Sequence, residues 1–390
     1  MQAKSLKGKS PSEIQSALQQ SMTDGFKPTL AIVFISIKQD RKAVCEILHQ
    51  NEIDIIGATS SGEFIDGHQD EGAIVILLLD LNKAYYTILF QDVGNMTVSD
   101  VATQMARAAL KHFSNPAFIL CSTGLSSTGK MMDGETLIRS IENVVGSHAN
   151  MFGGMAGDDL TFTGTFVFTH NQSTDYGMAA LILNEDKIGL HGMAISGWKP
   201  IGVTRTVTKS EDNLIYTIDD QPALDMYMRY LGSVLPSADN QNEFFENLGN
   251  QYPIQIERND RESLMCNPIG FDREKKALKC EINIQQGSKF RFSTPPDFDI
   301  VETVINKAKE LKNTNQADAD AVLIFSCAGR LAALGPMAQQ ENDGLAEVWN
   351  SPMAGFYSYG EFGRSVNGKH EFHSTTNSWV ALKEKTPSAP

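Results

Sequence analysis

The chain has 390 residues, of which 41% are hydrophobic and 21% charged, as in an ordinary globular protein large enough for two or three structural units. Its formal net charge is −14, which argues against binding to nucleic acids or anionic membranes, because both require a dense Lys and Arg surface. No stretch approaches the ~20 apolar residues of a membrane helix, and the first ten residues contain no apolar run. We therefore expect a cytoplasmic protein.

The cysteines predict no disulfide framework and no zinc site. They are odd in number and include no CxxC pair: Cys45, Cys121, Cys266, Cys280 and Cys327. Reduced thiols in a reducing compartment are the expected state.

The N-terminus predicts a short helix. Ser10, Pro11 and Glu13 form a capping box with proline at the first helical position, and the helix should run to about Met22. Residues 1–27 are therefore expected to form an N-terminal helical arm, followed by domains at 28–221 and 222–385 and a disordered tail at 386–390.

Internal similarity is the most informative feature of the sequence. Residues 57–64 (GATSSGEF) and residues 355–362 (GFYSYGEF) share Gly, Ser, Gly, Glu and Phe at the same offsets, and residues 151–158 (MFGGMAGD) keep the ending of glycine followed by an acid. Each of these corners, which we call Gly-acid corners, marks the end of one strand and the start of another structure.

Apolar strands precede and follow each Gly-acid corner. Residues 30–37, 117–122 and 321–326 are short β-branched runs typical of strands buried on both faces. Later strands are expected at 73–79, 165–169, 178–183 and 371–382, together with helices at about 98–113 and about 298–311. The sequence thus predicts an α/β fold with two related halves of mixed β-sheet, crossover helices and internal duplication.

A boundary between the halves is expected near Gln221 and Pro222. Residues 203–218 are strand-like with turn signals, and Pro222 opens a helix to about Leu231. Residues 232–250 are polar and predict a surface loop or a short helix.

The Gly-acid corners supply the first candidate ligand-binding residues, Ser60, Glu63, Asp158 and Glu361. Glycine permits backbone angles closed to other residues, and the carboxylate accepts from backbone donors or from a ligand amine. The alternative is that these acids only fasten turns.

A dense polar segment, SCAGR, follows the strand at 321–326. Ser326, Cys327 and Arg330 are candidates because ligands of open α/β sheets lie beyond the carboxyl ends of the strands. Arg330 would hold a carboxylate or lower the pKa of the Cys327 thiol. The alternative is a buried cysteine beside an arginine held in an ion pair.

Tyr357 and Tyr359 complete the candidate set. Two residues apart in an extended segment, they would share one face and line a pocket beside Glu361. They would otherwise be ordinary packed aromatics.

Two enzyme alternatives have weak support. Gly124 to Lys130 (GLSSTGK) nearly matches a P-loop, but Met131 replaces the hydroxyl that would bind Mg²⁺. A thiol enzyme using Cys327 would need a base that no motif supplies. We therefore expect no catalytic activity.

The histidines give no metal motif. His370 and His373 are three apart, so on a strand they point to opposite faces, only one is expected to face inward, and they cannot chelate one ion together. His148 and His191 are isolated.

The landmarks above, together with GWKPIG at Gly197 and PALDMYMRYLG at Pro222, resemble those of the FIST family over nearly the whole chain. The resemblance implies an intracellular sensory protein in signal transduction that binds a small ligand, proposed to be an amino acid or a related metabolite. No effector segment is recognisable outside the two FIST regions, so output would pass to a separate partner.

The chain is also similar to the NosP-like branch of that family, which binds haem, senses nitric oxide and acts on a histidine kinase or a cyclic-di-GMP enzyme in bacterial two-component signalling. This resemblance implies haem as a cofactor, with His373, His191 or His148 as the axial ligand; the FHSTT segment around His373 departs from the FHNQT more usual in the family. Three hypotheses about function remain open: a sensor of nitric oxide through haem, a receptor in which Arg330 and Glu361 hold a metabolite, and a scaffold with no ligand. Under either ligand hypothesis, the Gly-acid corners and residues 326–330 should surround a shared cavity.

Overall fold

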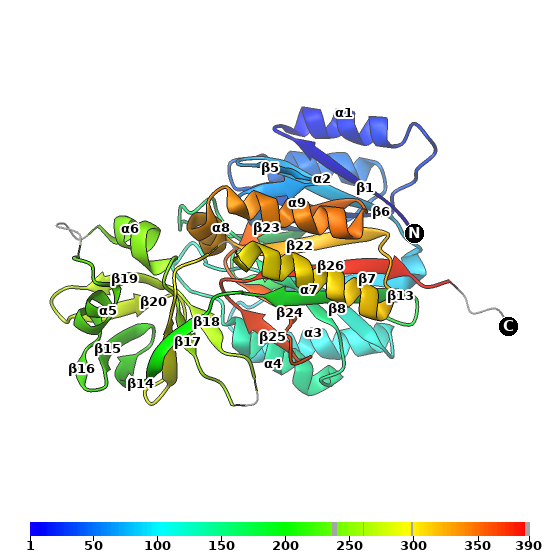
Figure 1. Ribbon diagram of the computed structural model, residues 1–390. Helices are drawn as coiled ribbons and strands as arrows, with labels where there is room; N and C mark the ends of the chain where they lie inside the picture. The colour runs from blue at the N-terminus through cyan, green and yellow to red at the C-terminus, as the bar shows by residue number, and fades with distance from the viewer. Residues whose placement is uncertain (236–239, 260, 298, 387–390) are drawn as a thin grey trace.

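The computed structural model describes residues 1–235, 240–259, 261–297 and 299–386 (Figure 1). In the described chain, three six-stranded sheets form a core, and a smaller β-rich domain packs beside it. The predicted mixed α/β fold with internal duplication is confirmed, and the duplication extends to three repeats.

The first repeat begins with a strand. Its elements are β1 (Gln2–Gly8), α1 (Pro11–Ser21), β2 (Leu30–Ser36), α2 (Arg41–Gln50), β3 (Asp54–Ser60), β4 (Glu63–Ile65), β5 (His68–Asp70) and β6 (Ile74–Asp80). The predicted helix is present and is capped by Ser10. The expectation of a separate helical arm at 1–27 is wrong, because β1 pairs with β6 along its whole length and so belongs to the first sheet.

The second repeat has the same order. Its elements are η1 (Lys83–Tyr85), β7 (Tyr86–Asp92), α3 (Val98–His112), β8 (Pro116–Ser122), α4 (Gly134–Val145), β9 (Met151–Met155), β10 (Val167–Thr169), β11 (Ser173–Thr174) and β12 (Gly177–Asn184).

The third repeat is interrupted by the small domain between its first strand and first helix. Its elements are β13 (Ile188–Ile195), α7 (Asp299–Asn315), β22 (Ala321–Cys327), α8 (Ala328–Leu334), α9 (Met337–Trp349), β23 (Met353–Ser358), β24 (Glu361–Arg364), β25 (His370–His373) and β26 (Asn377–Glu384). The run expected as one strand at 371–382 forms β25 and β26. Phe298, where α7 was expected to begin, lies outside the described residues.

Each repeat donates a hairpin to the sheet of another repeat. The sheet orders are β1-β6-β2-β3-β10-β11, β7-β12-β8-β9-β24-β25 and β13-β26-β22-β23-β4-β5. Strands β2 and β3 are parallel, as are β8 and β9 and also β22 and β23; one helix connects each of the first two pairs, and α8 and α9 connect the third. The two hairpin strands at the end of each sheet therefore come from a different repeat.

The inner faces of the three sheets share one hydrophobic cluster, which includes the rings of Phe34, Phe325 and Phe356. Alternate residues of the same strands face outward; Ala31, Val33 and Ile35 pack with residues of α1 and α2. Successive side chains thus point to opposite faces, and both faces are buried. The central strands are therefore continuous apolar runs.

The small domain is formed by residues that precede and follow the expected boundary. Its elements are β14 (Pro200–Glu211), β15 (Leu214–Ile218), β16 (Gln221–Pro222), α5 (Ala223–Leu231), α6 (Gln241–Phe244), η2 (Phe245–Gly249), β17 (Ile254–Ile256), β18 (Leu264–Cys266), β19 (Pro268–Asp272), β20 (Ala277–Cys280) and β21 (Lys289–Ser293). The boundary expected near Gln221 therefore falls inside one β-sheet. In Figure 1 this domain lies to one side of the core, away from both termini.

Two smaller predictions can also be placed. Of the tail expected to be disordered at 386–390, residues 387–390 lie outside the described chain. None of the helices described has the length and hydropathy needed to cross a membrane.

Candidate functional site

The three Gly-acid corners meet, as expected. Ser61 N donates to Tyr357 O at 3.0 Å, which joins the first corner to the third. Gly157 N donates to Thr59 O at 2.9 Å, and Met155 N donates to Gly360 O at 2.7 Å, so the second corner is joined to both others. The ends of β3, β9 and β23 therefore form a closed ring of contacts.

Two of the corners hold their glutamates in the same way. Ser60 Oγ donates to Glu63 and Ser358 Oγ donates to Glu361 at 2.7 Å, three residues along the chain in each case. The other carboxylate oxygen of Glu361 accepts from Thr376 N at 3.2 Å and Oγ1 at 2.8 Å. Burial raises the pKa of Glu63 to about 7 and that of Glu361 to about 8. Both acids thus fasten their turns.

Asp158 has a different arrangement. Its carboxylate is fully buried and accepts from the backbone N–H groups of Phe162, Thr163 and Gly164 and from the hydroxyl of Tyr359. The Asp158 carboxylate therefore organises the loop that follows it.

Arg330 has protein partners for its charge. It is fully buried, and its Nε donates to Glu341 Oε2 at 2.9 Å while a second nitrogen donates to Glu341 Oε1 at 2.5 Å. Its remaining nitrogen donates to Ser196 O at 2.5 Å. The hypothesis that Arg330 grips a ligand carboxylate therefore needs correction, because this guanidinium is already neutralised, as in the ion-pair alternative.

Cys327 and Ser326 lie at the buried end of β22. Burial raises the pKa of Cys327 well above its ordinary value, so Arg330 does not activate this thiol. Ser326 O accepts from Ser358 Oγ at 3.1 Å, which ties the end of β22 to the third corner.

The two tyrosines do not line one pocket. Tyr357 donates its hydroxyl to Gln69 Oε1 at 2.6 Å, whereas Tyr359 donates to Asp158. Tyr359 lies beyond the end of β23, where the chain turns, so the alternation of an extended segment no longer applies.

The small domain adds two polar residues to this region. Asn267 Nδ2 donates to Thr375 Oγ1 at 2.9 Å and to Glu281 Oε2 at 3.1 Å. A Cβ on Gly329 would lie 3.4 Å from Asn267 Nδ2 and 3.6 Å from Cys327 Sγ, which places Asn267 beside the end of β22. We call Cys327, Glu361 and Thr375 of the core, with Asn267 and Glu281 of the small domain, the polar seam.

The polar seam has an excess of acceptors. Burial raises the pKa of Glu281 as it does that of Glu361, and the nearby carboxyl of Glu281 further disfavours the ionisation of Glu361. Asn267 is 1% exposed, and its Oδ1 atom is buried with no hydrogen-bond donor. A buried carbonyl oxygen with no donor is costly, so this atom indicates an unmet need for an N–H or O–H group.

Neither of the two pockets described for this structure is lined by the polar seam or the Gly-acid corners, where a shared cavity was expected. The two pockets that the structure describes lie elsewhere: one of about 210 Å³ includes Ser36, Arg41 and Phe166 in its lining, and one of about 500 Å³ includes Lys209 and Tyr216. The polar seam is closed in this structure.

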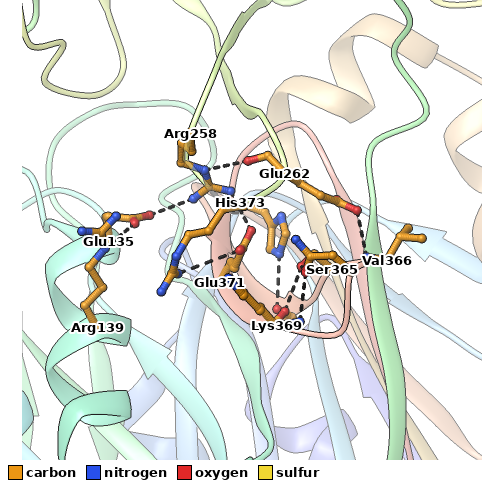
Figure 2. Close-up of polar contacts among 12 residues, drawn as sticks. Glu135, Arg139, Arg258, Glu262, Ser365, Val366, Lys369, Glu371 and His373 are labelled. Carbon is orange, nitrogen blue, oxygen red and sulfur yellow. Dashed lines mark hydrogen bonds and ion pairs between the residues drawn. The ribbon is translucent and has the colours of Figure 1, made fainter. Parts of the chain in front are cut away.

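A cluster of charges bridges the two domains (Figure 2), and its residue Glu371 precedes Thr375 of the polar seam by four positions in the chain. Arg258 of the small domain donates to Glu135 of α4 at 3.0 Å and to Glu371 of β25 at 2.7 Å. Arg261 donates to Glu142 of α4 at 3.0 Å. We call these five residues the ionic bridge.

The P-loop alternative is not realised in the structure. Ser126 N donates to Lys130 O at 2.8 Å, which folds Gly124–Lys130 into a turn, and helix α4 begins only at Gly134 behind its cap Asp133. The Lys130 ammonium lies 5.5 Å from the ring centre of Tyr176. A phosphate cradle needs this lysine at the start of the helix.

The chain matches the FIST N domain model over residues 29–221 and the FIST C domain model over residues 223–364. It belongs to the FIST family. FIST domains are sensory domains that bind small ligands in signalling. The two FIST regions meet at β16, so each contributes strands to the small domain. No match was found among curated proteins.

The histidines considered for haem do not provide the open axial position that a FIST gas sensor would need. His373 is 5% exposed and its Nε2 is hydrogen-bonded to Gly363 O at 3.2 Å, while burial lowers its pKa to about 3. His148 is exposed and His191 is half-buried, and neither lines a described pocket. These residues do not fit an apolar haem pocket.

The expectation that only one histidine of β25 faces inward is wrong. His370 is 4% exposed and pairs with Met151 and Asn150, so both histidines are buried. Among the described residues, no group of His, Cys, Asp and Glu is arranged to hold a metal ion.

Sequence reasoning missed Asn267, Glu281 and the ionic bridge. No recognised motif contains these residues, and the core partners of Asn267, Glu281 and Arg258 are more than ninety residues away. The pair of arginines in RNDR at 258–261 was the available signal.

Proposed function

We propose that this FIST protein senses a small amino-acid-like metabolite whose protonated amine binds at the polar seam. The observation that carries the proposal is the donor-less Oδ1 of Asn267 beside the buried carboxyls of Glu281 and Glu361. An ammonium group would supply both the missing donor and a compensating positive charge.

The neighbouring charges favour an amine over an acid. Arg330 is paired with Glu341, so it offers no free cation to a ligand carboxylate. A ligand with only anionic groups would add negative charge beside two carboxyls, which is unfavourable in a buried site. The proposal therefore keeps Glu361 as a ligand-binding residue. Asn267 and Glu281 take the place of Arg330 as its proposed partners in binding.

The signalling role follows from ligand-dependent closure. A ligand that contacts both Asn267 and Glu361 binds the closed arrangement of the two domains better than an open one, and this differential affinity shifts their population. The output would pass to a separate signalling protein such as a histidine kinase or a cyclic-di-GMP enzyme.

The test is a thermal-shift screen of the twenty common amino acids. The matched control compounds are α-hydroxy acids with the same side chains, which replace only the amine. We expect at least one amino acid to raise Tm while its hydroxy acid does not, and we expect Asn267→Leu to abolish the shift. Asn313→Leu, on an exposed part of α7, serves as the control variant and should keep it.

Binding should also release protons. Because the pKa of Glu361 is about 8, this carboxyl is largely protonated at pH 7 and must ionise to pair with an ammonium group. Calorimetric enthalpies in two buffers of different ionisation enthalpy should therefore differ. Equal shifts by hydroxy acids, or no shift by any amino acid, would contradict the proposal. A Soret band in the purified protein that moves with nitric oxide would instead favour the haem branch.

A further inference from the structure

A ligand cannot reach the polar seam in the closed structure. Glu361 and Thr375 are fully buried and Asn267 is 1% exposed. Asn267 belongs to the small domain and Thr375 to the core, so separating the two domains is the direct route to the site. What holds the domains together therefore controls access.

The ionic bridge is well placed to hold them. Arg258 is 10% exposed and Glu371 is fully buried, so the pair is shielded from solvent when the domains are closed. The backbone N–H of Val366 also donates across the boundary, to Glu262 Oε1 at 2.9 Å (Figure 2). Charged groups thus supply several contacts at this edge, beside an apolar cluster that both domains share.

Such a contact is suited to opening and closing. Burying ions costs solvation free energy that cancels much of their mutual attraction, and opening returns both charges to water, so the pair holds the closed state only weakly while loss of one partner favours opening. Arg261 Nη1 and Glu371 Oε1 are 3.9 Å apart, and each is buried without a hydrogen bond. The closed contact is therefore incompletely satisfied, which lowers the free energy needed to separate the domains.

The chain provides a simple hinge. The two domains are joined by two short segments, residues 196–199 and residues 294–298, and of the second the structure describes 294–297. Gly197 has φ +84°, a conformation that glycine adopts without strain. Because the two connecting segments lie close together, one domain can rotate against the other about them.

We propose that Arg258 and Arg261 act with Glu135, Glu142 and Glu371 as an electrostatic latch that gates the polar seam. The latch rests on the proposed function for its purpose, but its opening is a property of the protein without ligand. Strand β25 couples the two regions, because Glu371 lies in the latch and Thr375 follows four residues later in the polar seam. Ligand binding stabilises the closed latch, and breaking the latch exposes the site.

Hydrogen-exchange mass spectrometry of the full chain tests this inference without a ligand. We compare wild type, Glu371→Gln and the double variant Arg258→Met with Arg261→Met, following peptides that cover 371–377 and 264–268. The control is Asp225→Asn, which removes an ion pair with Lys276 inside the small domain. Exchange of β22 and β2 reports whether each variant remains folded.

We expect exchange at 371–377 and 264–268 to accelerate about tenfold in the latch variants, with β22 and β2 unchanged. Asp225→Asn should behave as wild type. Unchanged exchange in the latch variants, or equal acceleration throughout the chain, overturns the latch.

The two proposals fail separately. If the latch variants open locally but no amino acid stabilises wild type, the latch stands and the proposed ligand class fails. If an amino acid stabilises wild type and the latch variants exchange as wild type does, the ligand class stands and the latch fails.

Discussion

Glu63 and Glu361 are chemically identical side chains at equivalent places in two repeats, and both are fully buried. Burial disfavours their charged form, and the hydroxyls of Ser60 and Ser358 only partly compensate. Glu361 accepts a further hydrogen bond from the hydroxyl of Thr376. At the equivalent place, Ala73 donates to Glu63 only through its backbone N–H. The third repeat thus has the more elaborate polar environment.

The pKa of Glu361 predicts a pH-dependent stability. Its folded-state pKa is about 8 against an ordinary value of 4.5, so the folded protein binds this proton more tightly than the unfolded chain does. The stabilising contribution is fully present below about pH 4.5 and is lost as the pH rises through about 8. We expect the fall in unfolding free energy between pH 5 and pH 8 to be smaller in Glu361→Gln, measured by urea denaturation. Glu310→Gln, at an exposed position of α7, should leave this fall in unfolding free energy unchanged. Equal falls in wild type and both variants would refute the argument.

The buried pair of Arg330 and Glu341 predicts a non-additive effect. Arg330→Met leaves a buried carboxylate unpaired and should lower the unfolding free energy by about 3–5 kcal/mol. Adding Glu341→Leu should recover much of that loss, because no charge then stays buried. Arg139→Met removes an exposed pair with Glu135 and should cost less than ~1 kcal/mol. Additive losses in the double variant would show that the pair is not the cause.

At the level of elements, the corners depend on close approach of parallel strands. Gly153 pairs with Leu120 across β8 and β9, and a Cβ on Gly153 would lie 1.9 Å from Leu120 O. No side-chain movement relieves a clash with backbone. The glycine at this position is therefore required by space as well as by its φ of +152°.

Gly153→Ala should consequently destabilise the protein by more than ~3 kcal/mol or prevent folding. Gly25→Ala is the matched control: Gly25 has φ +91° and no atom within 4 Å of the Cβ position. That substitution should cost about 1–2 kcal/mol, the strain of the left-handed conformation alone. Similar losses in thermal denaturation of the two variants would contradict the spatial argument.

At the level of the whole molecule, the exchange of hairpins makes the repeats interdependent. The first repeat gives β4 and β5 to the third sheet and receives β10 and β11 from the second repeat. Without these partners, β3 and β4 would expose unpaired backbone groups at apolar strands. A repeat is therefore not a folding unit by itself.

A split-chain experiment checks this interdependence. Residues 1–83 alone should aggregate or stay unfolded, whereas co-expression with residues 84–390 should restore a soluble complex, because Asn82 and Lys83 are exposed between β6 and β7. Circular dichroism would show whether the fragments are folded, and size-exclusion chromatography would show whether they form a complex. A folded, monomeric fragment 1–83 would contradict the argument.

Local patterns predicted more of the molecule than long-range pairings did. The apolar runs at 30–37 and 321–326 and the helix at 98–113 were predictable because their signal lies in neighbouring residues. The pairing of β4 with β23 was not, since nearly three hundred residues separate the partners. The corners could be expected to matter and an ion pair at Arg330 was one of the alternatives, whereas the approach of Asn267 to Thr375, more than one hundred residues away, could not be predicted.

For the binding site proposed at the polar seam, the interruption of one repeat by the small domain predicts a single ligand per chain. Threefold repetition alone would predict three equivalent receptor positions, but only the third corner has Asn267 and Glu281 beside it. Titration should therefore saturate at one equivalent of ligand per chain, without cooperativity inside a single molecule.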